Sequence, residues 1–184
     1  MFDFPFIAVS EQDQRLTDSV IEKVLAHERA GKRRIPKNDQ RFLPVEIAET
    51  DGMRGECASA RYLGLRWKLA EVGWSEWSAG DLGYGIEVKS TSKPNGNLYC
   101  SSKTHADYMR RNMNTIVMLA RVDAWPWVEF PGWILAKDLP RYPFTPTNAR
   151  HNSGFLVPVE KLQPIDSLAQ WCFDRLKHEQ EMML

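Results

Sequence analysis

The chain has 184 residues, 43% of them hydrophobic and 26% charged. This size and composition fit one globular domain and exclude general disorder. No apolar run approaches the roughly 18 residues of a membrane span. Its 24 basic and 24 acidic residues cancel, so net charge neither favours nor excludes a polyanionic partner. The three cysteines, Cys57, Cys100 and Cys172, lack the spacing of a zinc site, so we expect reduced thiols in a cytoplasmic protein.

The N-terminal part predicts two helices joined by an irregular connector. Ser10 can cap a helix whose apolar spacing continues to about residue 31. Residues 32–50 have little regular pattern and predict the connector. Residues 53–70 predict the second helix, which ends before Gly73.

A basic cluster lies around this connector. Six basic side chains accompany one acid, Asp39, and they are Arg29, Lys32, Arg33, Arg34, Lys37 and Arg41. Such a cluster can contact the phosphates of a nucleic acid, with Arg33 and Arg34 as candidates. It can equally be a solvated loop, and both interpretations stay open.

The second part predicts a sheet followed by a closing helix. The run TIVMLARV at residues 115–122 is typical of a buried central strand, and residues 127–136 predict its partner, broken near Pro131. Further strands are predicted at 77–82, 86–91 and 155–159, a Pro-rich loop at 140–153 and a helix at 166–178, while 99–113 stays open between strand and helix. The expected fold is α/β (α+β), one domain over residues 1–184 with a mixed β-sheet flanked by helices.

The segment around residues 80–89 brings charged side chains together. Strand side chains alternate between faces, so Glu87 and Lys89 share one face. If residues 83–85 form a hairpin loop, Asp81 pairs with Glu87 across the two strands. Two carboxylates directly opposite each other on paired strands repel each other unless a cation lies between them. The pattern therefore predicts a site for a hard divalent ion.

Glu56 adds a third carboxylate. On the predicted helix it falls in line with the apolar stripe that includes Ala60, Leu63 and Trp67, so we expect it to point toward the sheet. A carboxylate buried there must be paired, protonated or bound to a metal. The alternative is that the helix end lets Glu56 reach water.

These residues resemble a known family. Asp81 followed after five residues by Glu87, Val88 and Lys89, with Glu56 before them and the apolar strand after them, resembles the PD-(D/E)XK nucleases, which include restriction enzymes, phage exonucleases and junction resolvases. The later segments GWILAKDLP and FLVPVEKL are similar to small phage-type members. One departure is Gly80, which stands where the family name has proline. The resemblance implies a restriction-endonuclease-like core over about residues 53–136, in a bacterium or an infected host cell.

The resemblance also implies a mechanism, the metal-dependent hydrolysis of phosphodiester bonds. Asp81, Glu87 and the backbone carbonyl of Val88 would bind Mg²⁺, for which Mn²⁺ would substitute, and Glu56 would complete the metal site directly or through water. Lys89 would orient the attacking water or stabilise the developing negative charge.

The expected partner is nucleic acid, with DNA favoured over RNA, and a homodimer is possible. Candidate nucleic-acid contacts are Ser90, Thr91, Lys93 and Lys103, which closely follow the motif, together with Arg33 and Arg34. Two alternatives stay open. The same fold can serve as a catalytically inactive nucleic-acid-binding module, or the charged residues can form only an ion-pair network in a structural or interaction protein.

Overall fold

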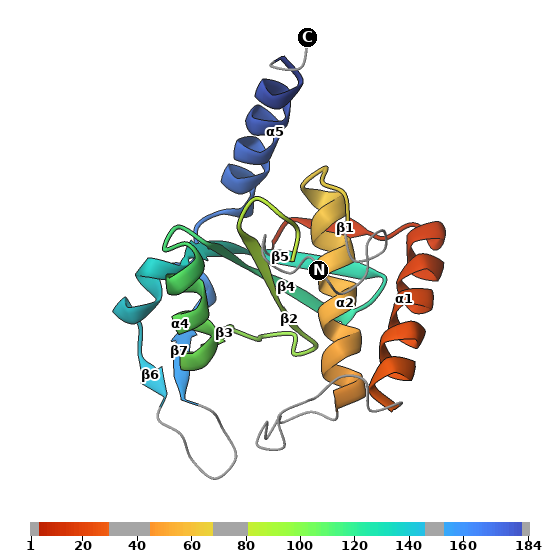
Figure 1. The fold of residues 1–184 in the computed structure, drawn as a ribbon, viewed down its shortest axis with the longest axis horizontal. Helices are drawn as coiled ribbons and strands as arrows, with labels where there is room; N and C mark the ends of the chain where they lie inside the picture. Colours follow the sequence, from red (N-terminus) through yellow and green to blue (C-terminus); the bar gives the residue numbers. More distant parts are fainter. Residues whose placement is uncertain (1–3, 30–44, 68–80, 146–152, 182–184) are drawn as a thin grey trace.

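A computed structural model describes residues 4–29, 45–67, 81–145 and 153–181 of the chain (Figure 1). Its helices and strands, in chain order, are β1 (Phe6–Ala8), α1 (Glu11–Arg29), α2 (Val45–Tyr62), β2 (Ile86–Thr91), β3 (Leu98–Ser101), α4 (Ser102–Arg111), β4 (Ile116–Ala124), β5 (Trp127–Leu135), β6 (Phe144–Thr145), β7 (Gly154–Val157) and α5 (Ile165–Glu181). Two 3-10 turns, η2 (Ala136–Arg141) and η3 (Val159–Lys161), follow β5 and β7.

The centre of the molecule is a mixed four-stranded sheet in the order β1-β5-β4-β2. Strands β2 and β4 are parallel, and the chain between them passes through β3 and α4, whereas β4 and β5 form an antiparallel pair. A smaller antiparallel sheet has the order β3-β7-β6. The expected mixed α/β fold with a mixed sheet flanked by helices is confirmed at this level.

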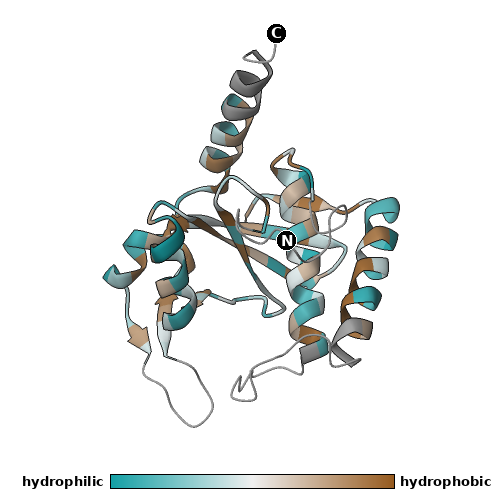
Figure 2. Cartoon of the chain, in the orientation of Figure 1, coloured by the Kyte–Doolittle hydropathy of each residue, from teal (hydrophilic) through white to brown (hydrophobic). Residues whose placement is uncertain are grey.

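Helices cover both faces of the central sheet. On one face α2 packs against β2 and β4, and α1 lies beside α2 (Figure 1). On the other face α4 lies with β3, β7 and η2. Figure 2 shows the central strands largely hydrophobic, whereas α1 alternates between hydrophilic and hydrophobic residues. None of the described helices combines the length and apolarity that a membrane crossing requires.

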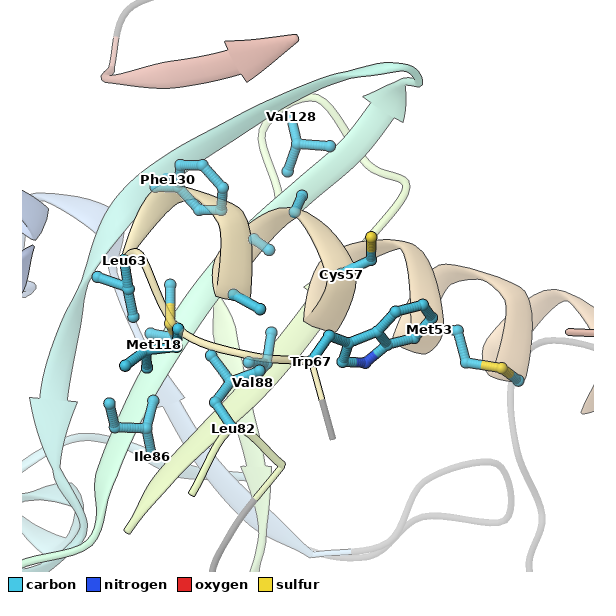
Figure 3. Packing of buried hydrophobic residues seen from close by; sticks show 14 of the residues in the cluster. Met53, Cys57, Leu63, Trp67, Leu82, Ile86, Val88, Met118, Val128 and Phe130 are labelled. Carbon is cyan, nitrogen blue, oxygen red and sulfur yellow. The ribbon is translucent and has the colours of Figure 1, made fainter. Parts of the chain in front are cut away.

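The side chains of β4 alternate between two hydrophobic cores. Met118 and Ala120 belong to the α2-side core, which lies beneath α2 and is drawn in part in Figure 3. Val117 and Leu119 belong to the α4-side core, which also contains Tyr108. An apolar strand buried on both faces explains why the sequence there is nearly continuous in hydrophobic residues.

Strand β5 changes faces within its length. Val128 and Phe130 lie in the α2-side core. Ile134 is also an even-numbered residue and would share their face in a regular strand, but it lies in the α4-side core. Between these positions β5 runs from 132 to 129 while β4 runs from 119 to 121, so β5 holds one extra residue. The break expected near Pro131 is therefore a bulge inside one strand. Gly132 belongs to this bulge, with a φ of 150°.

The second helix differs from the prediction at both ends. It begins at Val45 and ends at Tyr62, rather than covering 53–70. Gly64, with a φ of 67°, follows its last turn, and only a residue that tolerates this left-handed conformation ends a helix in this way. Trp67 therefore lies after the helix, in a segment without regular secondary structure, and Gly73 lies outside the described residues.

The strand predicted at 77–82 is also wrong where it can be compared. Residues 81–82 form a turn, and 77–80 lie outside the described residues. The open segment 99–113 contains the strand β3 and the helix α4, and the predicted closing helix is α5. The 140–153 segment includes the short strand β6, and β7 begins at Gly154 instead of 155.

Candidate active site

The site lies along the edge of β2 that pairs with no described strand, which is called the free edge below. The amide of Ile116 in β4 donates to the carbonyl of Gly85 at 2.8 Å, so odd-numbered residues of this segment turn their backbone groups toward β4. The amides and carbonyls of Ile86, Val88 and Ser90 consequently face the opposite edge. Among the described strands, none pairs with that edge.

Asp81 lies on this free edge. The Leu82 amide donates to the Ile86 carbonyl at 3.2 Å, and the Ile86 amide donates to the Gly83 carbonyl at 2.9 Å, so the chain turns back tightly onto β2. The Asp81 Oδ2 atom accepts a hydrogen bond of 2.8 Å from the amide of Val88. This contact places the carboxylate next to the edge that also carries the Val88 carbonyl.

The environment of Asp81 opposes its ionisation. Burial, followed by the charge of Glu87, raises the pKa of Asp81 from 3.8 to about 6, although Lys89, the Val88 amide and Arg111 act in the opposite direction. The predicted proximity of the two carboxylates is therefore present as electrostatic repulsion. The predicted pairing of Asp81 with Glu87 across a hairpin is absent, because Asp81 belongs to the turn and accepts a hydrogen bond from the Val88 backbone.

Glu87 and Lys89 point to the α4 face of the sheet. Their register partners on β4 are Val117 and Leu119, both in the α4-side core. The Glu87 side chain is 8% exposed, and its Oε1 atom accepts a hydrogen bond of 2.8 Å from Nη2 of Arg111 at the end of α4. Glu87 is thus a buried carboxylate held by an ion pair.

Lys89 lies against Tyr108, a buried residue of α4. Its Nζ atom is 5.6 Å from the centre of the tyrosine ring, and the Arg111 guanidinium carbon is 5.4 Å from the same centre. Burial alone would lower the pKa of Lys89, but interactions with Tyr108 and with the carboxylates of Asp81 and Glu87 outweigh it and raise the pKa. Lys89 therefore stays an ammonium ion.

Glu56 approaches the cluster from α2, on the other face of the sheet. Its Oε2 atom accepts a hydrogen bond of 3.3 Å from Nε1 of Trp67. Burial, and then the charge of Asp81, raises the pKa of Glu56 well above its ordinary value. A Cβ atom at the preceding Gly55 would lie 1.9 Å from Oγ of Ser90. The glycine therefore permits the close contact between α2 and β2 that brings Glu56 to the free edge.

A divalent ion at this site would need several oxygen donors. Within the described residues, no group of three or more histidine, cysteine, aspartate or glutamate side chains is arranged to hold a metal. What the structure shows is smaller: the Asp81 carboxylate is bonded to the Val88 amide, on an edge that also carries the Val88 carbonyl, and it is repelled by the charge of Glu87. Oxygen donors in this number fit Mg²⁺, which keeps several waters and takes one or two carboxylates.

The predicted nucleic-acid contacts are dispersed. Lys93 and Lys103 are exposed, whereas Oγ of Ser90 is buried and has no hydrogen-bond partner. Oγ1 of Thr91 accepts a hydrogen bond of 3.2 Å from the amide of Lys93. The buried Ser90 hydroxyl lies against Gly55 of α2, so it does not face a surface that could bind phosphate. Arg33 and Arg34 lie outside the described residues.

The sequence interpretation missed Tyr108 and Arg111 beside the cluster, and it placed Trp67 on the stripe of Glu56 without predicting the bond between them. Tyr108 and Arg111 are three residues apart on α4, so they share a helix face. That spacing was a usable signal once residues 102–111 were recognised as a helix. The bond from Trp67 to Glu56 had no usable signal of its own, because it depends on where α2 ends.

Comparisons of this chain with protein-family models, with curated proteins and with solved structures found no match. A functional assignment therefore depends on the residues along the free edge of β2.

Proposed function

We propose that this protein is a metal-dependent nuclease that hydrolyses phosphodiester bonds of nucleic acid, with DNA as the favoured substrate. The observation that carries the proposal is the position of Asp81, whose carboxylate accepts a hydrogen bond from the Val88 amide on the free edge of β2 and is repelled by Glu87. Buried carboxylates that repel each other are costly unless a cation joins them. The parallel strands β2 and β4, with α4 between them in the chain, are consistent with the restriction-endonuclease-like core that the resemblance implies.

In this proposal Asp81, Glu87 and the Val88 carbonyl hold Mg²⁺ or Mn²⁺, and Glu56 completes the site directly or through water. When bound, the ion neutralises the phosphate and lowers the pKa of a coordinated water. Lys89 donates a hydrogen bond to a phosphate oxygen or to the attacking water, and its raised pKa keeps it charged for that role.

One contact favours a second candidate function. Arg111 pairs with Glu87 at 2.8 Å, and Asp81 is bonded to a backbone amide, so both carboxylates have partners within the protein. The cluster could then be an ion-pair network in a structural or interaction protein. This candidate predicts that neither metal nor nucleic acid is bound.

A cleavage assay separates these functions. Purified protein is incubated with plasmid, linear and single-stranded DNA and with RNA, in Mg²⁺, Mn²⁺ or EDTA. Nuclease function predicts cleavage that EDTA abolishes and that is lost in Glu87→Gln. The matched control is Glu46→Gln, which removes an exposed carboxylate in the first turn of α2 and should cleave like wild type.

The other outcomes identify the alternatives. Binding of nucleic acid without metal-dependent cleavage indicates the inactive binding module. A protein that binds neither nucleic acid nor Mn²⁺ contradicts the proposed function and leaves the ion-pair network.

A further inference from the structure

The Glu87–Arg111 ion pair joins one buried and one accessible partner. The Glu87 side chain is 8% exposed, whereas that of Arg111 is 38% exposed. One hydrogen bond of 2.8 Å connects Nη2 of Arg111 to Oε1 of Glu87. Arg111 is also the last residue of α4, and Asn112 after it is extended. The guanidinium can therefore leave Glu87 by side-chain rotation, without unfolding any part of the helix.

Loss of Arg111 would leave the buried Glu87 carboxylate with Lys89 as its cationic neighbour, and a second cation in place of Arg111 would offset that loss. A divalent ion at the free edge of β2 is such a replacement. It would also add positive charge beside two cations that already share the Tyr108 ring, Lys89 and Arg111. Of these two, only Arg111 stands at a helix end with more than a third of its side chain exposed. The added repulsion therefore acts to expel Arg111.

We infer that Arg111 is an exchangeable counter-ion: it neutralises Glu87 while no divalent ion is bound, and it turns to a phosphate of the nucleic acid when the ion takes its place. The inference rests on the proposed function and assigns a further substrate-binding residue to that site. A guanidinium suits both partners, because its planar set of donors matches carboxylate and phosphate oxygens alike.

The first test measures Mn²⁺ affinity by calorimetry in the absence of nucleic acid. Arg111→Gln removes the competitor for Glu87, so it should bind Mn²⁺ more tightly than wild type, by up to about fivefold, the upper value of an exposed ion pair. Arg110→Gln is the matched control. It removes a neighbouring arginine that pairs with Asp107 on the outside of the same helix, and its Mn²⁺ affinity should equal that of wild type.

The second test measures binding of a labelled phosphorothioate oligonucleotide by fluorescence anisotropy. With Mn²⁺ present, Arg111→Gln should bind about tenfold more weakly than Arg110→Gln, because a charge-assisted contact to phosphate is lost. In EDTA the two variants should bind alike, since Arg111 is then engaged by Glu87. Comparing the two variants with each other cancels the effect of losing one positive charge.

The outcomes distinguish this inference from the proposed function. If wild type binds Mn²⁺ and cleaves, but Arg111→Gln binds Mn²⁺ no more tightly, or binds the oligonucleotide as well as Arg110→Gln does, the exchange role alone is overturned. If wild type neither binds Mn²⁺ nor cleaves, both fail. Should Arg111→Gln not fold, Arg111→Lys replaces it, and its Mn²⁺ affinity should exceed that of wild type because a single ammonium holds Glu87 less well. An unchanged affinity in that variant overturns the exchange.

Discussion

Replacing Asp81 with asparagine should stabilise the metal-free protein at alkaline pH. The substitution removes a charge that burial and Glu87 both disfavour. It keeps the local geometry, because an amide oxygen can still accept the hydrogen bond that Asp81 receives from the Val88 amide. It also removes a proposed metal ligand, so its effects on stability and on cleavage should be opposite.

The size of the effect follows from the pKa. Burial and Glu87 raise the pKa of Asp81 from 3.8 to about 6, and a difference of one in pKa corresponds to roughly 1.4 kcal/mol. Ionising Asp81 therefore costs the folded state about 3 kcal/mol relative to the unfolded chain. The pKa of Asp81 is higher in the folded state than in the unfolded chain. Below about pH 4 Asp81 is protonated in both states and wild type has its full stability, and it loses about 3 kcal/mol as the pH rises through about 6.

Thermal melting in EDTA at several pH values measures the difference. At about pH 8, Asp81→Asn should melt about 5 to 10 °C above wild type, and near pH 4 the advantage should vanish. Adding Mn²⁺ should raise the melting temperature of wild type more than that of the variant. The control Asp123→Asn changes an exposed carboxylate at the end of β4 and should melt like wild type. A variant less stable than wild type at pH 8, with both proteins indifferent to Mn²⁺, refutes this reasoning.

Three further predictions concern other parts of the chain. Lys89→Ala should lower single-turnover cleavage by about 10²-fold or more while keeping Mn²⁺ affinity, because no ligand is lost; turnover at the wild-type rate contradicts the assigned role. Changing both Arg33 and Arg34 to alanine should weaken binding equally across DNA sequences and flatten its salt dependence, and an unchanged slope returns the basic cluster to a solvated loop. Gly55→Ala should cost about 1 to 3 kcal/mol in a denaturant titration, since the new Cβ would lie 1.9 Å from Oγ of Ser90. Adding Ser90→Ala should restore part of that loss, and no recovery would mean that the clash lies elsewhere.

Hydrophobic patterning predicted the central strands well and the helix ends poorly. The run at 115–122 had to be a central strand, because both of its faces are apolar and both are buried in β4. The start of α2 was missed because Gly52 weakens the helical pattern in its first half. Gly55 is needed for close packing onto Ser90, which only the tertiary structure reveals.

The candidate site shows the same division between local and long-range information. That Glu87 and Lys89 share a face follows from strand alternation, and the structure places both toward the α4-side core. The hydrogen bond from the Val88 amide to Asp81 could not be foreseen, because it requires knowing which edge of β2 is free. Arg111 reaches Glu87 across 24 residues of sequence, and no short-range pattern indicates that contact.

The contact between Asp81 and the Val88 amide also bears on self-assembly. The outer strand of a sheet offers unpaired amides and carbonyls on which a strand of another molecule can add, and proteins counter this with turns and inward-pointing charges. Here the turn at residues 82–86 occupies the amide and carbonyl of Ile86, and the Asp81 carboxylate occupies the next outward amide. A residue proposed for catalysis would thus also protect against templated aggregation, so that selection for solubility and selection for chemistry act on the same side chain.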